Sequence, residues 1–156
     1  MRGKQAKKRK TKPDAVYNSK VVASLINNVM LDGKKVVAEG IVYKSFDILK
    51  KDLKKKPLDI IETAIENVKP KLEVKPRRVG GVNYQVPMPV SEQRQLSLAI
   101  KWIIQGARAR RKKEEFCEAF AAEIKDAYKN LGFAVKKRED MYKMAEANKA
   151  FAHFQW

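Results

Sequence analysis

The stretch EVKPRRVGGVNYQVPMPV, residues 73–90, decides the fold class. Its valines alternate with other residues as in a β-strand, and Gly80-Gly81 can supply the positive φ angles of a tight two-residue turn. Its three prolines cannot donate ladder hydrogen bonds, so these strands cannot sit inside a wider sheet. The stretch therefore predicts a two-stranded β-hairpin arm over residues 72–90 that projects from the rest of the chain.

A turn at the two glycines also sets the register of the arm and indicates what it contacts. Two adjacent arginines can fork to phosphate oxygens, and a tyrosine offers a stacking surface for a base. The alternative is a plain β-turn between helices, although loops of this length without a function are uncommon. The expected cross-strand pairs are Val79 with Val82, Arg77 with Tyr84, and Lys75 with Val86.

Helical spacing dominates on both sides of the arm. Pro57 suits the first turn of one helix, which Pro70 ends. The expected inward residues of that helix are Ile60, Ile61, Ala64, Ile65 and Val68, and those of the preceding helix are Val37, Ile41, Ile48 and Leu49. The first expected helix runs from a cap at Asn18 or Ser19 to a stop at Asp32-Gly33, the second covers 34–53 and the third covers 57–68. The fourth begins at a cap at Ser91, the fifth runs from Phe116 to a stop at Gly132, and the sixth begins at Ala134. A turn in RARRKKEE (108–115) separates the fourth from the fifth.

The fold class is therefore mainly α, a single-domain bundle of about six helices with the projecting hairpin between the third and fourth. A chain of 156 residues suits one domain. We expect a basic N-terminal extension over 1–12, the arm over 72–90, and a C-terminal helix and tail over 134–156.

Charge points to the class of partner. The chain carries 35 Lys and Arg against 18 Asp and Glu, a net charge of +17. Nucleic acid is the usual polyanion that neutralises such an excess, and an anionic membrane surface is the competitor. No signal peptide opens the chain and no run resembles a membrane span, so we expect a cytoplasmic protein without a membrane partner.

The charges are also segregated along the chain. Residues 93–113 hold seven basic residues and no acid, whereas 57–68 hold three acids and no base. Residues 114–126 hold five acids and one base. Because phosphate repels carboxylates, we expect the acidic helices to face away from nucleic acid. We expect the extension, KKDLKKKP (50–57), the arm and the fourth helix to share the binding side; the alternative is that these are only solvated faces.

The N-terminal extension MRGKQAKKRKTK carries seven basic residues and no acid. Nothing in it can bury enough surface to fold alone. It is interpreted as a nucleic-acid-binding arm, with a solubilising tail as the alternative.

No active site is evident. His153 stands beside aromatic residues, and Cys117 lies on an apolar helix face, typical of a small buried hydrophobe. One Cys and one His cannot form a structural zinc site, and DGKK at 32–35 lacks the rest of a phosphate-binding loop. We therefore expect no catalytic residues, no metal site and no cofactor.

Three blocks of the chain resemble the bacterial-type small-subunit ribosomal protein seven family: SKVVASLINNVMLDGKKVVAEGIVYKS (19–45), NVKPKLEVKPRRVGGVNYQVPMPVS (67–91) and AVKKREDMYKMAEANKAFAHFQW (134–156). The resemblance covers essentially the whole chain. It implies a ribosomal protein that binds the 3′ major domain of 16S ribosomal RNA and acts early in assembly of the small-subunit head. It also implies an arm near the exit-site tRNA and the mRNA path, small-subunit ribosomal proteins nine and eleven as neighbours, and no homo-oligomer.

The candidate RNA contacts come partly from charge and partly from this resemblance. Matching positions carry over the basic N-terminus, Lys34, Lys35, Arg77, Arg78, Arg94 and Lys101. Two departures are a Lys-rich N-terminus where many members have Arg, and Gln155 where a basic residue is common. The full set is Arg2, Lys4, Lys7, Lys8, Arg9, Lys10, Lys34, Lys35, Lys75, Arg77, Arg78, Tyr84, Arg94, Lys101, Arg108, Arg110 and Arg111.

Two other function classes compete with this interpretation. A DNA-bending architectural protein can insert a proline-tipped β-arm into a minor groove, but here glycines occupy the tip and the prolines flank it. An enzyme would need catalytic groups that the sequence scarcely offers.

Overall fold

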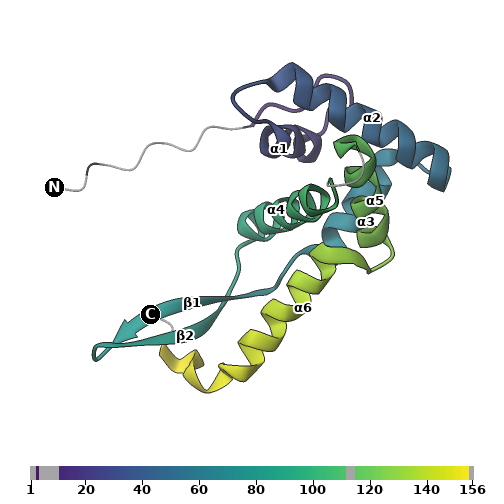
Figure 1. The fold of residues 1–156 in the computed structure, drawn as a ribbon. Helices are drawn as coiled ribbons and strands as arrows, with labels where there is room; N and C mark the ends of the chain where they lie inside the picture. The colour runs from purple at the N-terminus through teal and green to yellow at the C-terminus, as the bar shows by residue number, and fades with distance from the viewer. Residues whose placement is uncertain (1–2, 4–10, 112–114, 155–156) are drawn as a thin grey trace.

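The computed structural model describes residues 3, 11–111 and 115–154 (Figure 1). It is mostly helical, with a two-stranded antiparallel hairpin between the third and fourth helices, which confirms the expected fold class. The elements are α1 (Lys20–Val29), α2 (Lys35–Leu53), α3 (Pro57–Val68), β1 (Leu72–Val79), β2 (Val82–Pro89), α4 (Glu92–Arg110), α5 (Phe116–Tyr128), α6 (Gly132–Ala147) and the 3₁₀ helix η1 (Lys149–Phe154).

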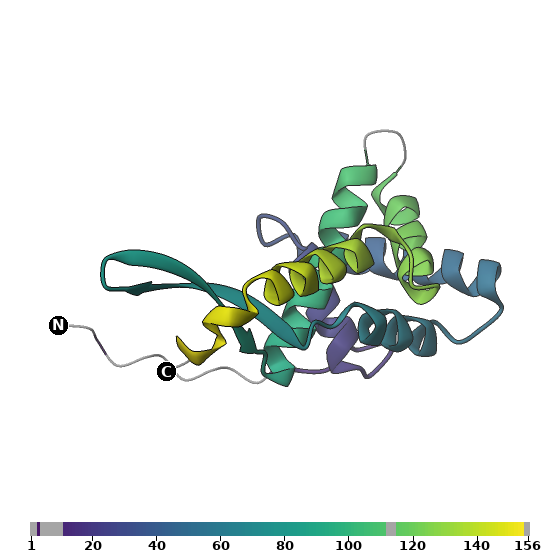
Figure 2. The same ribbon diagram turned by 90° about the horizontal axis from the view of Figure 1, so that it is seen from below.

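The helices α1 to α5 form the body of the molecule, and the hairpin and α6 leave it side by side (Figures 1 and 2). Helix α5 packs against α2, α3 and α4, while α1 packs against α2 and α4. Helix α6 runs from the body along β1, and η1 lies against β2. Along the described ranges, no helix combines the length and the apolar character that crossing a membrane requires.

The core lies where α5 meets the other helices. Its largest fully buried side chains include Phe46, Phe120, Ile60, Ile100 and Leu25, each at most 1% exposed. They come from five helices, so each amphipathic helix buries its apolar stripe against the others. The five predicted inward residues of α3 are all buried, which confirms the expected face of that helix.

Three details of the expected helices were wrong. Helix α1 ends at Val29, before the predicted stop, although Asp32 and Gly33 do form a left-handed turn with φ of 51° and 73°. Val37 is 59% exposed because the inward stripe of α2 runs one residue out of phase with it. Gly132 opens α6 instead of ending α5; Asn130, at φ 59°, takes the left-handed position after α5.

The break in RARRKKEE is where the charge run predicted it. Helix α4 ends at Arg110 and α5 begins at Phe116. Residues 112–114 lie outside the described residues. Ser91 and Ser19 occupy the predicted cap positions, and the Ser19 hydroxyl accepts a hydrogen bond from the Val21 N–H at 3.3 Å.

The hairpin has the predicted register. Gly80 and Gly81 have φ of 58° and 90°, as a two-residue turn between strands of natural twist requires. Val86 is fully buried, so the strands have a packed side although they form no wider sheet. The pairs are Val79 with Val82, Arg77 with Tyr84, and Lys75 with Val86.

Candidate nucleic-acid interface

Six of the candidate RNA contacts lie outside the described residues: Arg2, Lys4, Lys7, Lys8, Arg9 and Lys10. The described residues do show where this extension joins the body. The Asp14 carboxylate accepts hydrogen bonds from the N–H groups of Val16 (3.1 Å) and Tyr17 (3.0 Å), and from the Tyr43 hydroxyl on α2 (2.8 Å). Asp14 is 8% exposed, so it anchors the base of the extension to α2.

The charge state of this anchor follows from its contacts. Burial raises the pKa of the Asp14 carboxyl, but the hydrogen bonds from Tyr17, Tyr43 and Val16 outweigh burial and hold that pKa below its ordinary value. Burial and the neighbouring carboxylate raise the pKa of Tyr43 to about 12. The anchor is therefore a carboxylate held by a neutral phenol at neutral pH.

Three candidate cations have a carboxylate partner near the surface. Arg94 on α4 donates to Glu73 on β1 at 2.8 Å, and Lys75 lies 3.9 Å from the same carboxylate. The Arg94 hydrogen bond is the main cause that lowers the pKa of Glu73. Lys35 pairs with Glu39 at 3.5 Å within α2. The pair between Arg94 and Glu73 ties the root of the arm to α4.

A fourth candidate, Arg110, belongs to a cluster around a buried carboxylate. Its Nε lies 3.0 Å from Oε2 of Glu123, which is completely buried, and its Nη2 pairs with Asp126. The other oxygen of Glu123 accepts the backbone N–H of Ala134 at 3.0 Å. This cluster joins α4, α5 and α6, so Arg110 has a structural role that its place in a basic run did not indicate.

The six other cationic candidates among the described residues differ from these four. No ion pair among residues 11–111 and 115–154 involves them, so their charges are not neutralised by a carboxylate within the described chain. All but one are exposed; Arg77 is half-buried. They are Lys34, Arg77, Arg78, Lys101, Arg108 and Arg111, and we call them the carboxylate-free cations.

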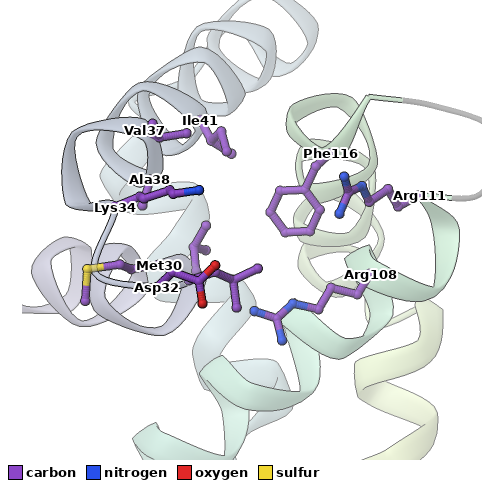
Figure 3. Close-up of a pocket in the computed structure, with 11 residues that line it drawn as sticks. Met30, Asp32, Lys34, Val37, Ala38, Ile41, Arg108, Arg111 and Phe116 are labelled. Atoms are coloured by element: carbon purple, nitrogen blue, oxygen red, sulfur yellow. The ribbon is translucent and has the colours of Figure 1, made fainter.

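Three of the carboxylate-free cations line one cavity of about 580 Å³ (Figure 3). Lys34 comes from the start of α2, whereas Arg108 and Arg111 come from the end of α4. Lys34 and Phe116 point toward each other across the opening, and Asp32 faces Arg108 (Figure 3). The sequence placed these cations in separate runs, and the fold brings them together.

Two others lie on the arm, beside Tyr84. Arg78 is exposed, and Arg77 faces Tyr84 across the strands. The Tyr84 ring lies 5.1 Å from Phe151 and 5.3 Å from Phe154 of η1, measured between ring centroids. Tyr84 thus has intramolecular partners that sequence reasoning did not foresee, and its stacking on an RNA base stays a prediction.

The lysines of KKDLKKKP do not join the other basic segments. The end of α2 lies at the opposite end of the molecule from the hairpin tip in both views (Figures 1 and 2). Asp52 there pairs with Lys125 at 2.6 Å, and Lys55 donates to the Tyr128 hydroxyl at 2.8 Å. The length of α2 carries this segment to the far end of the body, and its place on a binding side shared with the arm stays a prediction.

Asp32 and Phe116 are the cavity residues that sequence reasoning missed. Asp32 was read only as part of a turn, and Phe116 only as an apolar helix residue. The available signal was the aspartate of DGKK, which one glycine separates from the two lysines.

The chain is similar to known proteins over its whole length. The family model described as "Ribosomal protein S7p/S5e" matches residues 1–149. The "Small ribosomal subunit protein uS7" of Thermotoga neapolitana is 55% identical over 156 residues, covering all of both chains. The protein of the same name from Caldicellulosiruptor saccharolyticus is 57% identical over 150 residues and 96% of both chains, and that from Mycoplasma capricolum is 52% identical over 156 residues and all of both chains.

The family model matches almost the whole chain, and these relatives share more than half of its residues. This similarity agrees with the ribosomal family that the helical body, the hairpin arm and the excess of cations indicated. The matched family consists of ribosomal proteins and not of enzymes. The chain therefore belongs to the ribosomal protein S7p/S5e family.

Proposed function

We propose that this chain is a structural protein of the small ribosomal subunit in the cytoplasm, and that it binds the 3′ major domain of 16S ribosomal RNA directly. It helps to nucleate assembly of the subunit head. Its arm lies near the exit-site tRNA and the mRNA path, with small-subunit proteins nine and eleven as neighbours. The family and the relatives named for the small subunit support the ribosomal role.

One observation carries the RNA-binding part of the proposal: the carboxylate-free cations. In a chain with a net charge of +17, a cation without a carboxylate partner is neutralised by solvent ions or by a partner molecule. These cations come from the arm, from α2 and from α4, so they form contacts at several places. A folded RNA presents phosphates at several places at once, and each contact releases counterions.

The body and arm have different tasks in this mechanism. The packed helices fix the backbone positions of the cations of α2 and α4, which lowers the ordering cost of binding. The arm extends the contact surface beyond the body, with α6 and η1 packed along it. The whole chain thus acts as one RNA-binding unit that reads the shape of a folded junction.

The test is binding to a transcript of the 3′ major domain, in competition with random duplex DNA at physiological salt. We expect the RNA to bind more tightly than the DNA and its affinity to fall steeply as salt rises. Equal affinity for the two would contradict the proposal and favour an architectural DNA-binding protein. Co-sedimentation with small ribosomal subunits in high salt gives an independent measurement, and loss of the protein from the subunits at low salt would count against a structural role.

A further inference from the structure

The cavity between α2 and α4 has a composition that phosphate binding alone does not explain. Its rim carries Lys34, Arg108 and Arg111, but Asp32 stands among them. A carboxylate at a phosphate-binding surface costs electrostatic repulsion. Among the described residues, the Asp32 side chain makes no hydrogen bond and no ion pair, so it does not stabilise the turn that it occupies.

The walls of the cavity are apolar and partly exposed. Val37 is 59% exposed and Ile41 half-buried on one side, and the Phe116 ring stands on the other. Phe116 stacks on Phe120 with ring centroids 5.9 Å apart and ring planes at 10°, so its orientation is held from behind. An aromatic face opposite aliphatic side chains fits a flat aromatic ring, which is how unstacked RNA bases are held.

The volume agrees with one such ring and its backbone. Small-molecule sites have cavities of roughly 300–1,000 Å³, and this one measures about 580 Å³. No side chain caps the first turn of α2 at Lys34, so the positive end of that helix is open to a phosphate beside the cavity.

The polar groups select among the bases. A carboxylate only accepts hydrogen bonds, so the base edge that meets Asp32 must present donors. Guanine presents two adjacent donors, N1–H and N2–H₂, and on the neighbouring edge the acceptors O6 and N7, which suit an arginine fork. Asp32 and Arg108 face each other in the cavity and offer this combination of acceptor and donor (Figure 3).

We propose that this cavity binds one unpaired guanine nucleotide of an RNA. Phe116 and Val37 hold the base, Asp32 accepts from its Watson–Crick donors, Arg108 donates to O6 and N7, and Lys34 and Arg111 contact the flanking phosphates. The proposal rests on RNA binding as the function of the chain and adds to it a base-specific site.

The experiment uses the full chain and three single-stranded heptamers, UUUGUUU, UUUAUUU and UUUUUUU, with affinity measured by fluorescence anisotropy. We expect the guanine heptamer to bind roughly five- to a hundredfold more tightly than the other two, the range of one bidentate base contact. The methyl resonances of Val37 and Ile41 should shift on its addition. Equal affinity for all three heptamers would overturn the proposal.

The decisive variant is Asp32→Asn. Residue 32 has a φ of 51°, and asparagine adopts this left-handed conformation readily, so the turn is kept. We expect Asp32→Asn to remove the preference for guanine, because an amide offers only one acceptor atom. A preference that survives in Asp32→Asn would exclude the carboxylate contact.

The matched control is Arg78→Gln on the arm, outside the cavity. This variant should lower the affinity for all three heptamers by the same factor, so the ratio of the affinities should not change. A changed ratio would place the base contact on the arm. If the chain binds the ribosomal transcript but shows no guanine preference, only the base site is wrong. If it binds neither transcript nor heptamers, RNA binding itself fails and the base site fails with it.

Discussion

Two regions meet at the C-terminal end of α4 and use arginine in opposite ways. Arg110 turns toward α5, where it pairs with the buried Glu123 and the half-buried Asp126. Arg108, two residues earlier, turns toward α2 and lines an open cavity without a carboxylate partner in the described chain. Arg110 stabilises the fold, whereas we propose that Arg108 binds RNA, and only the helices packed on either side of α4 distinguish the two.

The cluster around the buried Glu123 is closely packed as well as charged. A Cβ at Gly106 of α4 would lie 2.6 Å from Cδ of Glu123, so only glycine allows the carboxylate this close to α4. A buried carboxylate of this kind must keep its partners, because a lone buried charge is very costly. Arg108 is exposed at its cavity and has no such constraint, so it can be replaced with little effect on stability.

The largest expected effect is on the buried side of this comparison. Glu123→Ala removes the partner of Arg110 and the acceptor of the Ala134 N–H, so we expect the free energy of unfolding to fall by about 3 kcal/mol. Urea denaturation measures it. The control, Glu118→Ala on the exposed face of the same helix, should change stability by less than about 0.5 kcal/mol. An equal loss of unfolding free energy in the two variants would mean that the cluster contributes no more to stability than an exposed glutamate does.

The second prediction concerns the arm. Replacing Arg77 and Arg78 with Ala should weaken binding to the 3′ major domain transcript by roughly tenfold or more, since phosphate contacts are lost. Helical content by circular dichroism should not change. The matched control is Lys50→Ala with Lys51→Ala, which removes the same charge at the opposite end of the molecule. A similar loss of affinity in that control would show that only net charge matters.

Much of the fold was accessible from the sequence. Pro57 and an apolar stripe defined α3, and Gly80-Gly81 gave the register of the hairpin, because both depend on residues close in the chain. Val37 was misplaced because residues 36, 37 and 38 are all apolar, and only Ala38 of the three faces the core. Local sequence patterns thus predicted the helices and strands, but not always which face of a helix is buried.

The candidate site was harder to predict from the sequence than the fold, for a physical reason. Whether an arginine binds RNA or a carboxylate depends on which helix packs beside it, and Arg110 and Glu123 are 13 positions apart in the chain. Tyr84 meets Phe151 and Phe154 from the far end of the sequence in the same way. Residue types and charge runs identified the candidate residues. Only the tertiary contacts show which of these candidates have a partner within the chain.

The third prediction tests the contact between the arm and η1. Tyr84→Ala removes two ring contacts, each worth roughly 0.5–1.5 kcal/mol beyond the buried area. We expect faster amide hydrogen exchange in β1 and β2, while α1 to α4 keep their protection. Arg78→Ala on the same hairpin serves as the control and should not change the exchange. Unchanged exchange in Tyr84→Ala would show that η1 does not hold the arm.

The smallest expected effect is the pH dependence of the Asp14 anchor. Its pKa is lowered in the folded chain, so its contribution to stability is present above the ordinary aspartate pKa and is lost as pH falls through the lowered value. Asp14→Asn should therefore cost about 1 kcal/mol near neutral pH, and the difference from the wild type should shrink below about pH 4. A difference that stays constant down to pH 2 would assign the effect to lost packing instead of charge.

The most direct test of the division between the two arginines is the salt dependence of RNA binding. The slope of the logarithm of the binding constant against the logarithm of KCl concentration is measured for the wild type, Arg108→Gln and Arg110→Gln. We predict that Arg108→Gln reduces the slope by about 0.7–0.9, the value of one phosphate contact, and leaves stability unchanged. Arg110→Gln should leave the slope unchanged and lower the free energy of unfolding. An equal reduction of the slope in both variants would contradict the claim that its carboxylate partners keep Arg110 from binding RNA while Arg108 binds it.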